Sequence, residues 1–462
     1  MIHPADLNSL QALCGGTVHG SNQQFDAIST DTRQLSRGEL FVALRGERFD
    51  AADFLLQAER AGACAAVVDQ FDERCGLSQL VVDDTLLALG QIAASQREYF
   101  TKPVIAITGS VGKTTCKEML DAILSRSGAV LATEGNLNNE IGVPLTLFRL
   151  ASEHDFAVIE MGAGKPGDIA YLSNIVRPNV ALVTTVAAAH LEGFGSIEAI
   201  AATKTEIYGG LAAGGWAVVN MDNAFTRKWA AEKSDSNLIG FSAEHDHVDV
   251  CATEIEQIEN STSAPGCFRF ELHLPKEHAL VELSVAGRHM VSNALAAAAC
   301  AHSAGASVAD IAAGLSSYQG YAGRMQQLNG VNDSRVIDDS YNANPTSMRA
   351  AIDVLATMSG LRILIMGDMA ELGETEKELH AEIGRYARQS DIDHLLCVGE
   401  LSALAAKEFG AAGEIFSSNS DCAARCRELL VGGMKDASVL VKGSRSAGME
   451  SVLAQLLKRT EN

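Results

Sequence analysis

The sequence predicts an α/β protein of three domains, and three observations lead to this prediction. The chain has 462 residues, which is more than one hydrophobic core usually organises. Short apolar segments of strand type alternate with helical stretches along most of its length, a pattern typical of doubly wound parallel sheets. A glycine turn at residues 109–112 joins one such strand, which begins at Val104, directly to a helix. We therefore expect a central P-loop-type doubly wound parallel sheet, with an α/β domain before it and a Rossmann-like domain after it.

The N-terminal α/β domain is expected over residues 1–84, followed by a connector over 85–103. Apolar runs bounded by glycine or polar residues indicate short strands, and a longer helical stretch indicates the connector. The elements predicted here are a turn and strand at Gly38–Arg45, a helix at Asp53–Gly62, a strand at Cys64–Asp69 and a helix at Leu86–Phe100 that ends near Pro103.

The central domain is expected over residues 104–319 and the C-terminal domain over 320–462. In each, apolar strands are separated by helical stretches. The central strands are predicted at Val104–Thr108, Phe156–Met161, Val180–Val186 and Trp216–Asn220. Alternating residues from Phe241 to Val285 predict an antiparallel insertion near the end of this domain. The C-terminal strands are predicted at Arg335–Asp338, Arg362–Met366, Leu395–Val398 and Ser438–Val441.

Composition excludes several classes of protein. The formal net charge is −22 and no basic run offsets it, which argues against nucleic-acid binding. Ten cysteines are scattered without a Cys-x-x-Cys pair, which favours reduced thiols in the cytoplasm and argues against structural zinc. No apolar run has the length that spans a bilayer, and the N-terminus lacks the layout of a secretory signal. We expect a cytoplasmic protein without membrane partners, and a monomer.

The clearest chemical signal is the segment from Val104 to Thr115. A buried strand leads into the turn Gly109-Ser-Val-Gly112 and then into a helix over 113–127, whose apolar stripe Gly128 can cap. Such a turn offers backbone N–H groups to a phosphate, Lys113 adds a point charge, and Thr114 can hold Mg²⁺. The common pattern G-x-x-x-x-G-K-[ST] is shortened here, because Ile107 stands in place of its first glycine. We predict a nucleotide-phosphate site; the alternative is a glycine turn beside a solvated lysine.

Two polar residues follow neighbouring strands of the predicted central sheet. Glu160 ends one strand and His190 follows the next, and ligands of such sheets gather at the carboxyl ends of the strands. A carboxylate near a triphosphate is suited to Mg²⁺, which prefers hard oxygen donors. The alternatives are an ordinary polar residue at a strand end and a structural histidine.

Lys204 interrupts an apolar helical stripe that runs over residues 197–211. A lysine on the core-facing side of a helix must snorkel to water, pair with a charge or be chemically altered. Burial would lower the pKa of its amine and leave the amine free for chemistry.

Polar residues at three further places fit a ligand or a simpler structural role. The loop with Asn136, Asn138 and Asn139 follows a strand at 130–132 and indicates either a turn or a ligand site. Asn293 opens an alanine-rich helix, where it either caps the helix or reads an adenine edge. Arg324 and the carboxylates near Asp339 bracket the start of the C-terminal domain, where they suit a γ-phosphate and a ribose, or form a surface ion pair.

Together these motifs resemble the Mur ligases, ATP-dependent amide-forming enzymes of peptidoglycan precursor synthesis. The matching segments span all three predicted domains in family order. They are Thr108–Thr115, Asn136–Asn139, Glu160–Gly162, His190–Gly195, Lys204 with Glu206, Gly287-Arg288 with Asn293, Gly323-Arg324, and Asp339 with Asn344-Pro345. The shortened phosphate loop is itself typical of the family.

Five segments resemble the branch of the family that adds D-alanyl-D-alanine to a UDP-N-acetylmuramoyl-tripeptide ending in diaminopimelate or lysine. They are Ser29–Arg33 with Phe41–Asp50, Asp339–Pro345, Gly367–Gly373 and Lys442–Glu450. The segment Ala163-Gly-Lys-Pro166 departs from the Ala-Asn-His that the family often has there. Another ligase of the superfamily, such as folylpolyglutamate synthetase, and a nucleotide-operated switch are the alternative readings.

The resemblance implies ATP and Mg²⁺ as cofactors and an acyl-phosphate intermediate. It implies that the N-terminal domain binds the UDP-sugar and that the C-terminal domain binds the dipeptide and closes on ATP, with a hinge near Gly314–Gly323. Lys113, Glu160, His190 and a carbamylated Lys204 would be catalytic, the last three together with Thr114 as metal ligands. ATP would contact Gly109, Ser110, Gly112, Lys113, Thr114, Thr115, Asn293, Arg324 and Asp339. The substrates would contact Ser29, Thr32, Arg33, Arg48, Asn136, Asn138, Asn139, Asn342, Asn344, Lys442, Ser444 and Arg445.

Overall fold

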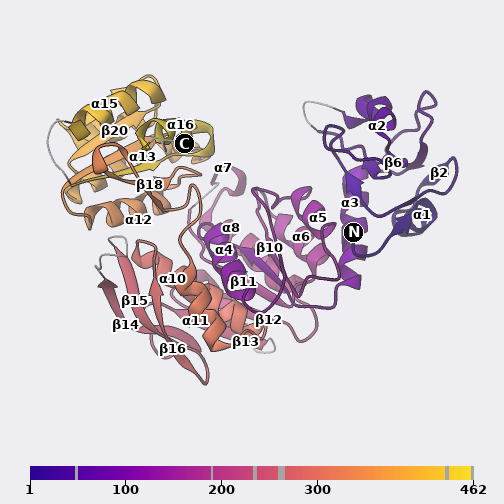
Figure 1. Cartoon of the computed structure of the whole chain (residues 1–462), viewed down its shortest axis with the longest axis horizontal. Coiled ribbons are helices and arrows are strands. Elements are labelled where there is room, and N and C mark those ends of the chain that lie inside the picture. The colour runs from indigo at the N-terminus through magenta and orange to yellow at the C-terminus, as the bar shows by residue number, and fades with distance from the viewer. Residues whose placement is uncertain (47–49, 189–190, 233–236, 259–265, 432–435, 459–462) are drawn as a thin grey trace.

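The structure, a computed structural model, describes residues 1–46, 50–188, 191–232, 237–258, 266–431 and 436–458. Within these residues the strands form one small sheet of two strands and three larger sheets of five, nine and six. Figure 1 shows the indigo N-terminal part and the yellow C-terminal part on opposite sides of the central part of the chain. The predicted α/β class is confirmed.

The five-stranded sheet belongs to the N-terminal part and has the order β2-β7-β6-β5-β4, in which only β2 is antiparallel. Its strands are β2 (Thr17–His19), β4 (Ile28–Ser29), β5 (Leu40–Val42), β6 (Ala65–Val68) and β7 (Ser78–Val81). The small sheet pairs β1 (Ala5–Asp6) with β3 (Gln24–Phe25), and the helical elements are α1 (Leu7–Cys14), the 3-10 turn η1 (Ala51–Phe54) and α2 (Leu55–Ala61). The helix predicted from Asp53 thus begins as a 3-10 turn, which Asp50 caps by accepting a hydrogen bond from Ala52 N.

The connector helix α3 (Thr85–Tyr99) is fastened to the central part of the chain. Asp84 caps its N-terminus by accepting hydrogen bonds from the backbone of the first turn. Near its C-terminus the buried guanidinium of Arg97 donates to the carbonyls of Phe100, Val176 and Arg177. Because Val176 ends helix α6 (Asp168–Val176), this one side chain ties the ends of two helices together.

The nine-stranded sheet has the order β16-β15-β14-β13-β12-β11-β8-β10-β9. From β9 to β14 neighbouring strands are parallel, and β15 and β16 are antiparallel. Its strands are β8 (Val104–Thr108), β9 (Val130–Ala132), β10 (Phe156–Glu160), β11 (Val180–Val183), β12 (Trp216–Asn220), β13 (Asn237–Ser242), β14 (Val250–Ile258), β15 (Cys267–His273) and β16 (His278–Leu283). The predicted antiparallel insertion therefore extends the central sheet at one edge.

Helices cover the sheet on both faces, as the doubly wound pattern predicts (Figure 1). They are α4 (Lys113–Leu124), α5 (Gly142–Leu147), α6, α7 (Leu191–Phe194), α8 (Ile197–Thr205), η2 (Glu206–Gly210), α9 (Ala224–Glu232), α10 (Arg288–Ser303) and α11 (Val308–Ser317). The prediction that Gly128 caps α4 is wrong. The helix ends at Leu124, and Gly128 donates to the Leu124 carbonyl from beyond a short turn.

The six-stranded sheet of the C-terminal part has the order β17-β18-β22-β19-β20-β21 and is parallel apart from β17. Its strands are β17 (Gln326–Asn329), β18 (Arg335–Asp339), β19 (Leu361–Gly367), β20 (His394–Val398), β21 (Gly413–Phe416) and β22 (Ala437–Lys442). The helical elements are η3 (Val331–Asp333), α12 (Pro345–Ala356), η4 (Gly373–Thr375), α13 (Glu376–Gln389), α14 (Ser402–Phe409), α15 (Asn419–Val431), η5 (Arg445–Ala447) and α16 (Glu450–Leu456). No helix in the described ranges is long and apolar enough to cross a bilayer.

Candidate active site

A cavity of about 970 Å³ lies where the central and C-terminal parts of the chain meet. One wall is formed by the phosphate-loop segment and by residues after β9, β10 and β11. The other wall comes from residues after β18, β19 and β22. Both sheets thus present the carboxyl ends of their strands to the same space, where open α/β sheets bind ligands.

The glycine turn after β8 has the backbone that the sequence predicts for a phosphate loop. Gly109 and Gly112 have φ values of 149° and 85°, and a Cβ on Gly109 would lie 1.9 Å from Thr184 Oγ1. Lys113 begins α4 and its ammonium donates to the Gly109 carbonyl at 2.9 Å, which closes the turn. Burial lowers the pKa of Lys113, while the nearby carboxylate of Glu160 acts in the opposite direction. A phosphate placed here would find both backbone N–H groups and a desolvated cation.

Thr114 and Glu160 form the oxygen-rich part of the cavity. Thr114 Oγ1 donates to Glu160 Oε2 at 2.9 Å, and Asn138 Nδ2 donates to Glu160 Oε1 at the same distance. Both Thr114 and Glu160 are buried, at 8% and 3% exposure. A buried carboxylate next to a hydroxyl at a phosphate loop suits Mg²⁺, so the residues present fit the metal that the sequence predicts. His190 lies outside the described residues.

Lys204 lines the same cavity and is buried there. It lies at the end of α8, is 3% exposed, and its ammonium is 5.9 Å from the centre of the Phe194 ring. Burial and the positive charge of Lys113 lower its pKa to about 7. The apolar stripe does not continue as one α-helix to Leu211, because α8 gives way to the 3-10 turn η2. Snorkelling to solvent is excluded by the burial of Lys204.

The loop with Asn136, Asn138 and Asn139 borders the cavity, and its three asparagine side chains make different contacts. Asn138 holds Glu160, as described above, and Asn139 Oδ1 accepts hydrogen bonds from the backbone of Ile141 and Gly142 at the start of α5. Asn136 also lines the cavity. Part of the loop therefore forms a turn and part of it faces the cavity, so the turn is confirmed and the ligand contacts stay a prediction.

Of the two readings that the sequence leaves open for Asn293, the structure excludes the helix cap. Helix α10 begins at Arg288 after Gly287, which places Asn293 in the second turn. There its side chain lies against the phosphate loop, and a Cβ on Gly112 would come within 2.5 Å of Asn293 Oδ1. Asn293 also lines the cavity, so a ligand contact is the reading that fits its position.

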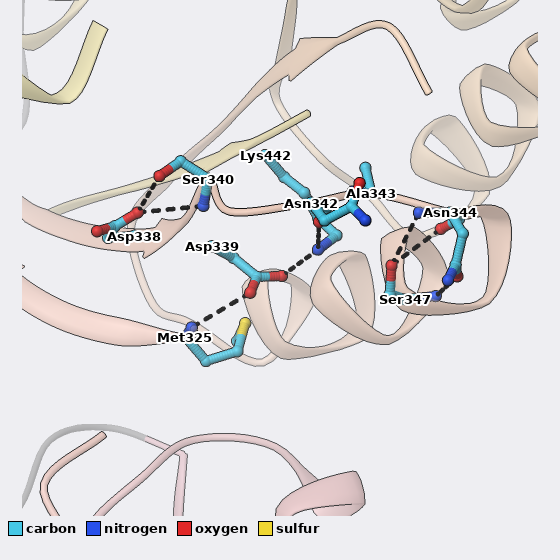
Figure 2. Close-up of polar contacts among 9 residues, drawn as sticks. All are labelled: Met325, Asp338, Asp339, Ser340, Asn342, Ala343, Asn344, Ser347 and Lys442. Atoms are coloured by element: carbon cyan, nitrogen blue, oxygen red, sulfur yellow. Dashed lines mark hydrogen bonds and ion pairs between the residues drawn. The ribbon is translucent and has the colours of Figure 1, made fainter. Parts of the chain in front are cut away.

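The C-terminal wall is organised by Asp339 at the end of β18 (Figure 2). Its carboxylate accepts hydrogen bonds from Lys442 Nζ at 2.5 Å and from Met325 N at 3.3 Å. Lys442 also donates to the Asn342 carbonyl at 2.8 Å and is buried with its partner. The alternative of a surface ion pair between Arg324 and Asp339 is not what the described residues show, because Asp339 pairs with Lys442 in a desolvated place and Arg324 donates to Thr114 instead. Asp339 and the Asn342 carbonyl use two of the three N–H donors of Lys442, and because Lys442 also lines the cavity its contact with a dipeptide carboxylate stays a prediction.

Other residues of this wall have local structural partners. Asn344 caps α12 in a capping box with Ser347, and Asn342 Oδ1 accepts from the backbone of Ala343 (Figure 2). Arg445 pairs with Glu450, and Ser444 Oγ lies 3.1 Å from Ser446 Oγ. Asn342, Asn344, Ser444 and Arg445 all border the cavity, which keeps their predicted substrate contacts open to test.

Of the predicted substrate residues of the N-terminal part, those that the structure describes, Ser29, Thr32 and Arg33, do not line this cavity. Ser29 Oγ donates to the Asp31 carbonyl, and Arg33 makes a two-pronged ion pair with Asp31. Arg33 is largely exposed, as its side chain retains 82% of its surface. Thr32 lies between them in the chain, and Arg48 falls outside the described residues.

Two components of the cavity wall lie inside matched motifs, but the sequence analysis did not assign them to the site. They are Tyr341 in Asp339–Pro345, and Ala370, Glu371 and Leu372 in Gly367–Gly373, the loop after β19. That loop is held by His380, whose Nε2 accepts from Met369 N at 2.9 Å and whose Nδ1 donates to the Glu376 carbonyl at 2.6 Å. The motifs mark both segments, and the contacts between segments show that these residues face the cavity.

The neutral state of His380 predicts a dependence of stability on pH. Burial lowers the pKa of its imidazole below the ordinary 6.5, against opposing effects of Asp368 and Glu376. Below pH 6.5 the His380 imidazole takes up a proton in the unfolded chain but stays neutral in the folded chain. The contribution of His380 to the free energy of unfolding is therefore present above pH 6.5 and is lost as the pH falls below it. We expect the Tm difference between the wild type and His380→Gln to shrink from pH 8 to pH 5. A Tm difference independent of pH would contradict this assignment.

Family models and curated relatives both match this chain to Mur ligases over nearly its full length. Family models match at residues 24–97 (Mur ligase family, catalytic domain), 107–301 (Mur ligase middle domain) and 323–445 (Mur ligase, glutamate ligase domain). The UDP-N-acetylmuramoyl-tripeptide–D-alanyl-D-alanine ligase of Escherichia coli strain K12 is 44% identical over 450 residues, covering 97% of this chain and 98% of the relative. Its counterpart from Haemophilus influenzae is 39% identical over 99% of both chains.

Solved structures are similar over the same extent. A crystal structure of MurF from Acinetobacter baumannii superposes with a TM-score of 0.91 at 38% identity, covering 98% of each chain. MurF ligase from Thermotoga maritima in complex with ADP gives a TM-score of 0.82 at 28% identity, covering 93% of this chain and 96% of the other.

Proposed function

This chain belongs to the Mur ligase family, and from that premise we propose that it joins D-alanyl-D-alanine to UDP-N-acetylmuramoyl-tripeptide at the expense of ATP. The products are the UDP-linked pentapeptide, ADP and phosphate. The enzyme thus works in peptidoglycan synthesis as an ATP-dependent acid–D-amino-acid ligase. Its substrates are soluble small molecules, which suits a monomeric enzyme of the cytoplasm.

The observation that carries this function is the arrangement of the shared cavity. The phosphate loop, Glu160 and Lys204 come from the central part, and Arg324 reaches across from the C-terminal part to donate to Thr114 Oγ1 at 3.3 Å. A ligase that activates a carboxylate with ATP must hold a triphosphate beside a second anion, and this requires several cations in one desolvated place. A nucleotide-operated switch would need the phosphate loop but not the buried Lys204.

ATP is proposed to lie with its phosphates on the loop Gly109–Thr115. Ser110 and Thr115 border the cavity with the loop glycines, Asn293 lies against Gly112, and Arg324 faces the loop from the other side. Thr114, Glu160, His190 and Lys204 would hold Mg²⁺, which neutralises phosphate charge and orients the triphosphate when bound. Asp339 is placed to accept from a ribose hydroxyl with a carboxylate oxygen, although Lys442 and Met325 already use part of its capacity.

The reaction proceeds in two transfers. A carboxylate oxygen of the tripeptide attacks the γ-phosphorus, the bond to the β-phosphate bridging oxygen breaks, and ADP leaves. The amine of D-alanyl-D-alanine then attacks the acyl carbon, phosphate departs with its bridging oxygen, and the amine loses a proton. Lys113 and Arg324 lower the repulsion between the carboxylate and the triphosphate in the first transfer. In the second transfer they stabilise the leaving phosphate.

We assign a role to each predicted domain on the same basis. Residues 1–84 bind the UDP-sugar, residues 104–319 bind ATP, and residues 320–462 bind the dipeptide and close on ATP. The hinge that permits closure is better confined to 318–323 than to 314–323. Gly314 lies inside α11, and a Cβ there would come within 2.5 Å of Ile123 Cα on α4.

Phosphate release with each component omitted in turn tests this function. The purified protein with ATP, Mg²⁺, UDP-N-acetylmuramoyl-tripeptide and D-alanyl-D-alanine should release phosphate, and omission of either substrate should reduce release to the background rate. Single amino acids in place of the dipeptide should not support release. Release that needs folate or glutamate instead would assign the chain to another activity of the superfamily and overturn the proposal.

A further inference from the structure

Tyr341 lies at the junction of the two walls and contacts cations of the cavity through its ring. The Arg324 guanidinium carbon is 4.2 Å from the centre of this ring, and that of Arg445 is 5.6 Å from it. Both distances are within the range of a cation–π interaction. The ring borders the cavity from the segment between β18 and α12.

The backbone is shaped so that Arg324 passes over this ring. Gly323 has a φ of 75°, and a Cβ on it would lie 3.0 Å from Tyr341 Cβ. Tyr341 N also donates to the Gly323 carbonyl at 3.2 Å. A side chain at position 323 would be strained and would crowd the tyrosine, so glycine permits the close approach.

No carboxylate among the described residues pairs with the guanidinium of Arg324. Its Nη2 donates to Thr114 Oγ1 at 3.3 Å, and its buried Nε has no acceptor within the described ranges. A carboxylate would neutralise the guanidinium and occupy its N–H groups. An aromatic face stabilises the same cation while leaving those donors free. The guanidinium lies next to the phosphate loop, as its Nη2 contact with Thr114 shows, so an anion bound in the cavity can accept from its N–H groups.

We propose that Tyr341 is a positioning residue that holds Arg324 over the phosphate loop and keeps its N–H donors available for the terminal phosphate of ATP. This inference rests on the proposed function for its ligand, and it deepens that function by assigning the residue that orients Arg324. Tyr341 acts through Arg324 and through its ring; its hydroxyl has no part in the effect. Arg445, which is paired with Glu450, contacts the ring from farther away and has a secondary effect.

Nucleotide binding separates this role from a general effect on structure. We would measure Kd values of the full-length protein for ADP and for the non-hydrolysable ATP analogue adenylyl imidodiphosphate by calorimetry with Mg²⁺ present. Tyr341→Leu should weaken binding of the analogue about tenfold or more and change ADP binding little, because the lost contact concerns the terminal phosphate. Tyr341→Phe, the matched variant that keeps the ring, should bind both nucleotides as the wild type does. Tyr341→Met provides a second ring-free variant if the leucine variant does not fold.

A double-mutant cycle with Arg324→Gln supplies the deciding comparison. If Tyr341 acts through Arg324, adding Tyr341→Leu to Arg324→Gln should weaken analogue binding no further. Additive effects, an equal loss of ADP and analogue binding, or a loss in Tyr341→Phe as large as in Tyr341→Leu would each overturn the proposal. Because these measurements need no ligation, their failure is distinguishable from failure of the proposed function, which would appear as wild-type protein that binds nucleotide but forms no pentapeptide.

Discussion

Replacing Lys204 with alanine is expected to lower kcat about a thousandfold, and short carboxylic acids such as formate or acetate should restore part of the activity. Lys204 is buried in the cavity beside Lys113, and its pKa of about 7 leaves much of its amine neutral at physiological pH. A neutral amine reacts with CO₂ to give a carbamate, which the family resemblance implies here. The carbamate carboxylate would be the metal ligand, and a small carboxylic acid in the space left by the side chain can replace it.

The rescue must be specific to this position. Lys113→Met should be inactive with or without added carboxylic acid, because the lost group there is a cation. Initial rates over a formate series for both variants, with Tm values to verify folding, make the comparison. Full activity of Lys204→Ala without any acid would show that Lys204 has no catalytic role.

Replacing Lys113 with methionine is expected to lower kcat/KM for ATP about a thousandfold while leaving the Tm close to that of the wild type. Its ammonium closes the phosphate loop at the Gly109 carbonyl and is desolvated, so it is placed to neutralise phosphate charge. Methionine preserves the stem of the side chain and removes only the charge and the donors. Steady-state rates over an ATP series measure the change.

Lys117 is the matched control for Lys113, since both are lysines of α4; Lys117 is buried and Lys113 is half-buried. Its ammonium donates to the Thr133 carbonyl and pairs with Glu118, and it does not line the cavity. Lys117→Met should lower the free energy of unfolding by about 1–3 kcal/mol and keep its kcat. An equal loss of activity in the two variants would mean that removing any positive charge from α4 lowers activity, which would contradict a specific role for Lys113.

The features predicted best are those that depend on local sequence. The strand, turn and helix of the phosphate loop follow from an apolar run, two glycines and a helical stripe, and β8 and the start of α4 lie where these patterns place them. Glu160 was found because carboxyl ends of parallel strands gather ligands. Lys204 was found because a cation on an apolar stripe needs an explanation, and its burial confirms that it lies on the core side.

The features missed depend on contacts between distant segments. The edge strands β17 and β21 are short, and β17 is polar, so neither has the apolar run of a buried strand. The burial of Lys442 with Asp339 arises where two neighbouring strands, β18 and β22, end together, and the two residues lie 103 positions apart. The ring of Tyr341 beneath Arg324 requires the backbone conformation of Gly323, which sequence spacing does not reveal.

Mass spectrometry of the reaction products with an isotope label tests the central claim most directly. The tripeptide would carry ¹⁸O in its terminal carboxylate, and the complete mixture would contain ATP, Mg²⁺ and D-alanyl-D-alanine. We predict a UDP-linked product that has gained one D-alanyl-D-alanine unit. We also predict that the released phosphate carries one ¹⁸O atom, because the carboxylate oxygen that attacks the γ-phosphorus leaves with the phosphate. A tripeptide that remains unchanged in mass while the protein binds ATP would contradict the ligase function, and a pentapeptide formed without ¹⁸O in phosphate would contradict the acyl-phosphate mechanism.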